Sequence, residues 1–329
     1  MKFAIFGAGA VGCWIGARMA ATGADVTLIG RAKLMAEISN GIRATDLAGG
    51  DVDAKPRTAT DASAAREADI IVVTVKSTAT TTAGRELAAV AKPDAVIVSL
   101  QNGVRNADLL AAALPGRRVL AAMVEFNVIK PAPATYHRAT IGKLIVQADP
   151  GALPLAVAWR AAGITTQIRE DMPAVLWGKL VLNLNNAINA LSGVPLATEM
   201  VQRDFRRCFA AAQREALGAL AAAKMPIAQL IAIPPKWMPT LLSLPDAIFR
   251  VVAKRAVAID PAARSSMWDD FEAGRPTEID FLQGEVIALA DKLGRAAPVN
   301  RGLVRLVRDA EAGGRRDWTG AELRKQLGV

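Results

Sequence analysis

The chain has 329 residues, of which 52% are hydrophobic and 22% charged, a composition that excludes a mostly disordered protein and suits two domains. No apolar stretch is long and charge-free enough to cross a membrane, and the net charge of +9 is spread along the chain, which argues against nucleic-acid binding. With two cysteines, Cys13 and Cys208, and no secretory leader, we expect a cytoplasmic protein without a disulfide scaffold or a cysteine-built metal site.

A single histidine, His137, narrows the available chemistry. Triads, multi-histidine metal sites and histidine-dependent dehydrogenases all need a well-placed imidazole. The neighbours of His137 indicate a loop entering a strand, so we expect a surface or second-layer residue. Proton transfer in this chain is therefore expected from a lysine or a carboxylate.

The first thirty residues carry the strongest motif. The apolar run Lys2–Phe6 leads into the turn Gly7-Ala8-Gly9-Ala10-Val11-Gly12, then a predicted helix, Cys13–Ala21, and a second apolar run, Val26–Ile29. Strand, glycine turn, helix and strand in this order are typical of a dinucleotide-binding unit. We therefore assign residues 7–12 to cofactor binding. A signal peptide is the alternative, but Arg18 and the interleaved glycines argue against it.

Each glycine of this turn has an expected task. Gly7 makes the tight turn, Gly9 lets the backbone approach a pyrophosphate, and Gly12 lets helix and strand pack closely. The phosphates are expected over the helix N-terminus, where N–H groups and the helix dipole favour anions.

Arg31 follows the second strand, where an NAD-specific protein usually has an acidic residue. A guanidinium binds a 2′-phosphate bidentately, whereas a carboxylate repels it. We therefore predict NADP as the cofactor; an incidental surface arginine is the alternative.

The pattern beyond Arg31 predicts the rest of the fold. A helix to about Ser39 and a hairpin within 41–55 come first. Buried strands and alanine-rich helices then alternate, and from Asp171 onward the sequence pattern predicts almost only helices. The expected elements are strands at Asp69–Val75, Ala95–Leu100 and Val119–Val124, helices at Thr81–Val90 and Ala107–Leu114, a strand pair around Thr135–Gln147, a linker at Pro150-Gly151 and one more α/β piece to about Arg169.

This order predicts an α/β fold, with an N-terminal Rossmann-like doubly wound sheet over residues 1–170 and a C-terminal all-helical domain over 171–329. Exposed apolar helix faces in the second half are compatible with a homodimer.

Polar residues follow two of the predicted strands. Lys76 comes directly after Val75, and Gln101-Asn102-Gly103 follows Leu100. Ligands on doubly wound sheets bind beyond the carboxyl ends of the strands, so Lys76 and Asn102 are candidate ligand residues. The alternatives are a solvated strand end for Lys76 and an Asn-Gly turn for Asn102.

The helix expected from Met172 to Leu191 carries a polar seam. Lys179, Asn183 and Asn186 are spaced i, i+4, i+7 and share one face. Asparagine is a mediocre helix former and a poor core residue, so this face favours contact with a ligand. Hydrogen bonding between helices is the alternative for Asn186.

A capping pattern stands near the C-terminus. Thr277 and Asp280 have the spacing of a capping box, so Thr277 is expected to start a helix with Glu278 in its first turn. The helix dipole alone suffices to favour a carboxylate there.

Taken together, the chain resembles the ketopantoate reductase family over nearly its whole length. The resemblance is carried, in chain order, by the glycine turn, Val75-Lys76, Gln101-Asn102-Gly103, Lys179-x-x-x-Asn183 and two later segments, Ser265-Ser266-Met267 and Thr277-Glu278-Ile279-Asp280. It implies NADPH-dependent reduction of ketopantoate to pantoate, a step toward pantothenate and coenzyme A. Lys179 would be the general acid, Asn102, Asn183 and Ser266 would orient the substrate, Arg31 and Lys76 would hold the cofactor, and Glu278 would link the ribose and substrate hydroxyls.

The chain departs from the family pattern at two places. The second asparagine of Lys-x-x-x-Asn-x-x-x-Asn is replaced by Ala187, and either Asn186 or Asn189 could stand in for it. Glu125 and Asn127 occupy a segment expected to be small and threonine-rich. A reductase of a different 2-oxo acid therefore remains an alternative. A non-catalytic NADPH-binding regulator is an alternative of a different class, and the presence of Lys179 and Glu278 speaks against it.

Overall fold

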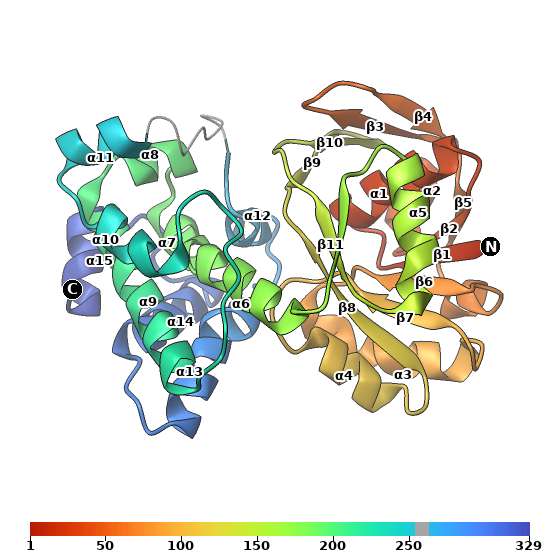
Figure 1. Ribbon diagram of the computed structural model, residues 1–329. Coiled ribbons are helices and arrows are strands. Elements are labelled where there is room, and N and C mark those ends of the chain that lie inside the picture. Colours follow the sequence, from red (N-terminus) through yellow and green to blue (C-terminus); the bar gives the residue numbers. More distant parts are fainter. Residues whose placement is uncertain (254–262) are drawn as a thin grey trace. The chain divides into compact units, whose positions relative to one another are not determined.

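The structure is a computed structural model that describes residues 1–253 and 263–329. The chain divides into two compact units, Met1–Met172 and Pro173–Val329 (Figure 1).

An eight-stranded sheet forms the centre of the first unit, in the order β12-β11-β8-β7-β6-β1-β2-β5. Its strands are β1 (Lys2–Phe6), β2 (Asp25–Ile29), β5 (Arg57–Ala59), β6 (Ile70–Val73), β7 (Val96–Ser99), β8 (Arg118–Val124), β11 (Leu144–Gln147) and β12 (Thr166–Arg169). Strands β5, β2, β1, β6, β7 and β8 run parallel, and β11 is antiparallel to β8. The chain leaves β1 toward β2 and returns to β6 on the other side of β1, so the predicted doubly wound sheet is confirmed. Its topological switch point lies at the carboxyl ends of β1 and β6.

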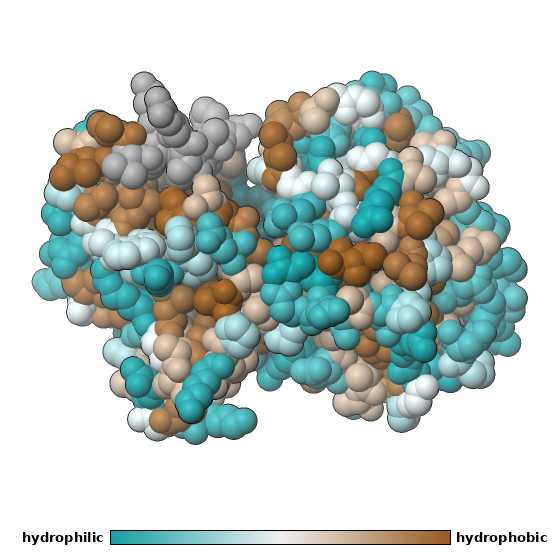
Figure 2. Space-filling model, viewed as in Figure 1, coloured by the Kyte–Doolittle hydropathy of each residue, from teal (hydrophilic) through white to brown (hydrophobic). Residues whose placement is uncertain are grey.

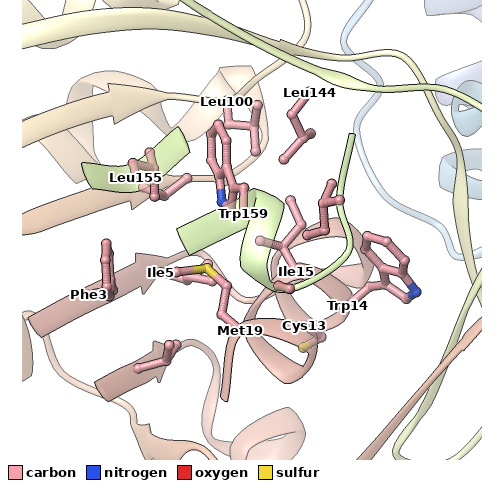
Figure 3. Close-up of a cluster of buried hydrophobic side chains, with 14 of the residues drawn as sticks. Phe3, Ile5, Cys13, Trp14, Ile15, Met19, Leu100, Leu144, Leu155 and Trp159 are labelled. Atoms are coloured by element: carbon pink, nitrogen blue, oxygen red, sulfur yellow. The ribbon is translucent and has the colours of Figure 1, made fainter. Parts of the chain in front are cut away.

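Helices cover both faces of this sheet. They are α1 (Ala10–Ala21), α2 (Ala32–Ile38), α3 (Thr80–Val90), α4 (Asn106–Ala113) and α5 (Leu153–Ala161), with short 3₁₀ turns η1 (Ala62–Ala65), η2 (Ser77–Ala79) and η3 (Pro150–Ala152). Figure 1 shows α3 and α4 along one face and α1 and α5 on the opposite face. Because side chains alternate along a strand, Ile5 packs toward α1 and α5, whereas Ala4 packs toward α3 and α4. In Figure 3, Trp159 of α5 lies beside Leu100, Leu144 and Leu155 in the first of these cores.

A second, four-stranded sheet has the order β4-β3-β10-β9. Its strands are β3 (Ile42–Asp46), β4 (Val52–Ala54), β9 (Val128–Ala132) and β10 (Thr135–Arg138). The hairpin expected within 41–55 is confirmed by the antiparallel pairing of β3 with β4. Both strands expected around Thr135–Gln147 form, but their pairing with each other is wrong, because β10 belongs to this small sheet whereas β11 joins the large one. His137 lies on β10, with its Nδ1 2.8 Å from the Thr45 hydroxyl.

Helix α1 packs against both sheets of the unit. Trp14 donates its indole N–H to the Thr45 carbonyl at 2.9 Å, and the guanidinium groups of Arg18 and Arg138 lie over the Trp14 ring at 5.2 and 5.4 Å. Arg138 also pairs with the buried Asp46 carboxylate at 2.8 Å. These charges are buried yet paired, so they fasten the small sheet onto α1.

In the described part of the second unit, all regular secondary structure is helical. Its helices are α6 (Met172–Asn183), α7 (Asn185–Ser192), α8 (Leu196–Met200), α9 (Arg203–Ala222), α10 (Met238–Leu242), α11 (Asp246–Ala253), α12 (Ser266–Glu272), α13 (Gln283–Lys292), α14 (Pro298–Glu311) and α15 (Gly320–Leu327), with 3₁₀ turns η4 (Pro235–Trp237) and η5 (Ile279–Phe281). The longest, α9, packs against α10, α13, α14 and α15. The mixed α/β fold class predicted from the sequence is therefore confirmed.

Among the described residues, no helix combines the length and hydrophobicity needed to cross a bilayer. Figure 2 shows hydrophilic and hydrophobic residues interspersed over the face in view. Cys13 and Cys208 are both buried and unbridged.

Candidate active site

The glycine turn stands at the switch point of the large sheet, and its three glycines meet different surroundings. Gly7 has a φ of +95°, and a Cβ there would lie 2.4 Å from Val75 Cγ1. A Cβ on Gly12 would lie 2.7 Å from the Thr74 hydroxyl. On Gly9 the nearest atom would be the Gly7 carbonyl oxygen, 3.9 Å away. The protein itself therefore excludes side chains at Gly7 and Gly12, whereas the space beside Gly9 is open to a bound group.

The residues of this turn fit a pyrophosphate. Gly9 is the N-cap of α1 and offers no side chain to its first turn, and no acidic residue stands in that turn. The first N–H groups of a helix have no intrahelical acceptor, so those of Ala10, Val11 and Gly12 can donate to an anion. Ala8, within the turn, is buried. This arrangement can hold a dinucleotide cofactor.

Arg31 follows β2 directly after Gly30 and is the exposed N-cap residue of α2. The Gly30 N–H donates to the Ala59 carbonyl at 3.0 Å, which fixes the end of β2 against β5. The position that would carry an acidic residue in an NAD-specific protein thus carries a guanidinium on a fixed backbone.

Lys76 and Asn102 lie on neighbouring loops, after β6 and β7. The Ser77 hydroxyl donates to the Asn102 carbonyl at 3.0 Å, so the two loops are joined. Beneath them, the buried Gln101 amide donates to the Val75 carbonyl at 3.1 Å and to the Thr80 hydroxyl at 2.7 Å. The structure therefore brings the two predicted residues to the same edge of the sheet as the glycine turn.

A further residue that holds these two loops, Asn106, was not predicted from the sequence. Asn106, at the start of α4, accepts from the Thr80 hydroxyl at 2.7 Å and donates to the Ser77 hydroxyl at 3.1 Å. Buried amides and hydroxyls that satisfy one another in this way hold loops rigidly. Polar residues at two successive helix starts are the signal from which this network could have been predicted.

Glu125 and Asn127 follow β8. The Glu125 carboxylate accepts the Lys143 backbone N–H at 3.2 Å and lies 3.7 Å from the Lys143 ammonium. Asn127 is exposed, and its backbone N–H donates to the Thr140 hydroxyl at 2.8 Å. Both residues thus connect the end of β8 to the chain before β11.

In the second unit, Lys179 and Asn183 lie one turn apart on α6, and both are half-buried. The single helix expected to run to Leu191 is wrong, because α6 ends at Asn183 and α7 begins at Asn185. The buried Gln283 amide donates to the Leu184 carbonyl at 2.8 Å, which satisfies the backbone at the break. Gln283 thereby ties the start of α13 to the junction between α6, which carries Lys179, and α7.

The two alternative asparagines of α7 differ in burial. Asn186 is half-buried, whereas the Asn189 side chain is fully buried and its amide hydrogen-bonds to Val194, Glu199 and Ser265. The polar atoms of Asn189 are already engaged inside the unit, which leaves Asn186 as the better placed of the two alternatives for contact with a ligand.

The environment of the Glu199 carboxyl changes its protonation. Burial raises its pKa from the ordinary 4.5 to about 8, and hydrogen bonds from Asn189 and Asn185 only partly counteract this. Nothing in the sequence pattern pointed to Glu199, because acidic residues are rarely fully buried.

The helix expected to begin at Thr277 is wrong. Residues Ile279–Phe281 form a 3₁₀ turn with Glu278 as its N-cap residue, and the α-helix begins only at Gln283. The Thr277 N–H donates to the Glu311 carboxylate of α14 at 2.8 Å, and Arg308 of α14 binds both Asp280 oxygens at 2.7 and 2.6 Å. Buried Glu278 is thus held between two anchors on α14. Ser266, the first residue of α12, is exposed.

Family models match most of the chain. Residues 3–151 match the model described as ketopantoate reductase PanE/ApbA, and residues 171–311 match its C-terminal counterpart.

Individual relatives agree with these matches. A 2-dehydropantoate 2-reductase of Halobacterium salinarum is 28% identical, over 95% of this chain and 100% of its own length. A crystal structure of a PanE/ApbA family ketopantoate reductase from Ralstonia eutropha JMP134 is 30% identical with a TM-score of 0.82, covering 95% of this chain and 99% of its own. A D-mandelate dehydrogenase solved with NADH and anilino(oxo)acetate shares the fold, with a TM-score of 0.80 at 21% identity and coverage of 95% and 99%.

Proposed function

Because the chain belongs to the ketopantoate reductase family, we propose that it catalyses the NADPH-dependent reduction of 2-dehydropantoate (ketopantoate) to pantoate. It is an oxidoreductase acting on CH–OH groups and using a nicotinamide cofactor. The product would serve the synthesis of pantothenate and coenzyme A. The observation that carries the proposal is Lys179 with Asn183 one turn later on α6, in a chain whose one histidine is bonded to Thr45.

The first unit would hold the cofactor. The N–H groups at the start of α1 would bind the pyrophosphate, the Arg31 guanidinium would bind the 2′-phosphate, and Lys76 would contact the cofactor from the end of β6. The cofactor held there would supply the hydride for reduction at C2 of the 2-oxo acid. Open space beside Gly9 and the absence of an acidic residue in the first turn of α1 support this assignment.

Lys179 would act on the oxygen of the reacting carbonyl. Reduction at C2 places negative charge on that oxygen, and an ammonium group both stabilises the charge and supplies the proton. Asn102, Asn183 and Ser266 would orient the substrate, and the half-buried Asn186 of α7 would offer a further amide to it. Glu278 would bind hydroxyl groups of the ribose and the substrate, supported by its fixed position between two anchors on α14.

A reductase of a different 2-oxo acid is the second candidate. The observation in its favour is the carboxylate of Glu125 after β8, in a segment where the resemblance leads us to expect small, threonine-rich residues. A carboxylate at the carboxyl end of a strand changes the charge that a substrate meets there.

Steady-state oxidation of NADPH by the purified protein tests both candidates. The panel would contain ketopantoate, pyruvate, 2-oxoisovalerate and phenylglyoxylate, with NADH in a parallel series. The largest kcat/KM with ketopantoate supports the proposal, and a larger value with another oxo acid supports the second candidate. Cofactor binding without turnover of any oxo acid would indicate a regulator instead.

A further inference from the structure

The second unit contains a buried carboxyl–amide pair outside the residues assigned to the reaction. Glu199 on α8 and Asn189 on α7 are both 0% exposed, and the Asn189 amide donates to the Glu199 carboxyl at 2.7 Å. Burying two polar side chains costs free energy unless each is hydrogen-bonded. We therefore ask which hydrogen bonds this pair makes and which segments they hold in place.

Asn189 is bonded from three directions. Besides Glu199, its Nδ2 donates to the Val194 carbonyl at 2.9 Å, and its Oδ1 accepts the backbone N–H of Ser265 at 2.9 Å. The amide is therefore oriented by α8 and by the turn after α7, and it presents its oxygen to the residue directly before Ser266.

The Ser265 side chain continues the connection. Its Oγ accepts the Trp268 N–H at 3.2 Å, which caps α12, and donates to the Asn186 carbonyl at 3.2 Å. Close by, the Leu196 N–H of α8 donates to the Ala263 carbonyl at 2.9 Å. The backbone and the side chain of Ser265 are thus both hydrogen-bonded to α7. Ala263, two residues before Ser265, is hydrogen-bonded to α8.

We propose that Asn189 and Glu199 are positioning residues, which fix the Ser265 backbone and thereby place the Ser266 hydroxyl for binding the 2-oxo acid. The inference rests on the proposed function, because it takes Ser266 as a substrate residue. Neither Asn189 nor Glu199 touches the substrate; both act through the start of α12.

The chain offers a matched control in the same unit. Asn300 is also 0% exposed and also donates to a carboxylate, that of Glu215, at 2.7 Å. This second pair joins α9 to the start of α14, and none of its hydrogen bonds involves Ser265. Asn300→Ala therefore removes a comparable buried amide without touching the attachment of α12.

The test compares Asn189→Ala, Glu199→Ala, Glu199→Gln and Asn300→Ala with the wild type. Asn189→Ala and Glu199→Ala should raise KM for the oxo acid about tenfold, the effect of weakening one hydrogen bond, while KM for NADPH stays unchanged. Glu199→Gln should retain the wild-type KM, because its amide oxygen can still accept from Asn189. Asn300→Ala should lower the melting temperature but leave both KM values unchanged.

Hydrogen exchange of the backbone amides supplies a readout independent of turnover. Asn189→Ala should accelerate exchange at residues 265–268, and Asn300→Ala should not. If the wild type reduces no oxo acid, the proposed function fails, and exchange alone then decides whether the pair fixes α12. Unchanged exchange, or unchanged KM in an active Asn189→Ala protein, overturns the inference. If Asn189→Ala does not fold, Ser265→Ala removes the cap of α12 with the interior pair intact, and the same rise in KM and faster exchange are required.

Discussion

The free energy of unfolding should fall as the pH rises through neutrality, and Glu199 should cause a large part of this fall. Its carboxyl has a pKa of about 8 in the folded protein, against 4.5 ordinarily, because it is fully buried. Between these two values the folded chain holds a proton that the unfolded chain has released, so raising the pH favours unfolding. The contribution is complete below about pH 4.5, is lost progressively up to about pH 8, and changes little beyond that.

The magnitude follows from the size of the shift. A rise from 4.5 to about 8 spans about 3.5 pH units, and each unit corresponds to about 1.4 kcal/mol. Ionisation of Glu199 therefore lowers the free energy of unfolding by on the order of 5 kcal/mol at alkaline pH relative to acidic pH. Glu199→Gln keeps the shape and the hydrogen bond from Asn189 but cannot ionise, so it should abolish this cost.

Urea unfolding of the wild type and Glu199→Gln, followed by tryptophan fluorescence from about pH 5 to about pH 9, measures the difference. All other titrating groups are common to both proteins, and burial raises the pKa of the nearby Cys208 thiol to about 12, outside this range. The variant should become increasingly more stable than the wild type as the pH rises. Parallel curves for the two proteins would refute the reasoning.

Three further outcomes are expected. Lys179→Ala should lower kcat by orders of magnitude and leave the Kd for NADPH nearly intact; near-native turnover would remove Lys179 from its role. Arg31→Ala should raise KM for NADPH at least about tenfold and leave KM for NADH unchanged, and equal effects on both cofactors would contradict the 2′-phosphate assignment. Gly7→Ala should lower the melting temperature steeply, because its Cβ would lie 2.4 Å from Val75, whereas Gly9→Ala should keep the wild-type melting temperature and weaken cofactor binding in titrations. Equal melting temperatures for the two glycine variants would contradict this division.

The parallel core of the fold could be predicted from the sequence because its strands are continuous apolar runs separated by helices. The edge strands of the two sheets could not be predicted in this way. Strands β5 and β9 were missed, since β5 has three residues and β9 is mostly exposed, so neither has an apolar face to recognise. The chain from Thr135 to Gln147 was expected as one pair, but β10 pairs with β3 and β9 whereas β11 pairs with β8 and β12. Long-range pairing of this kind leaves no local signal.

The candidate site shows the same division. Gly7, Gly9, Lys76 and Asn102 could be placed from motif spacing, because the topology of a parallel sheet brings strand ends together. The sequence around Leu184 carries no signal for the break, and the side chain that binds the Leu184 carbonyl there, Gln283, lies ninety-nine residues later in the chain. The residues on either side of Glu278 are likewise bound by Glu311 and Arg308 of α14. A local capping pattern contains no information about these distant contacts.

The packing of α1 between two sheets has a thermodynamic consequence for ligand capture. Trp14 and the arginines stacked on it anchor α1 to the small sheet, so the N–H groups of its first turn are held in a fixed direction. When a phosphate binds, the chain then loses little conformational entropy, because the helix start is already ordered. Little of the electrostatic attraction is offset in this way, so the phosphate binds more tightly. We therefore expect a substitution that loosens the small sheet, such as Arg138→Ala, to weaken nucleotide binding, although Arg138 lies on β10 and not in the glycine turn.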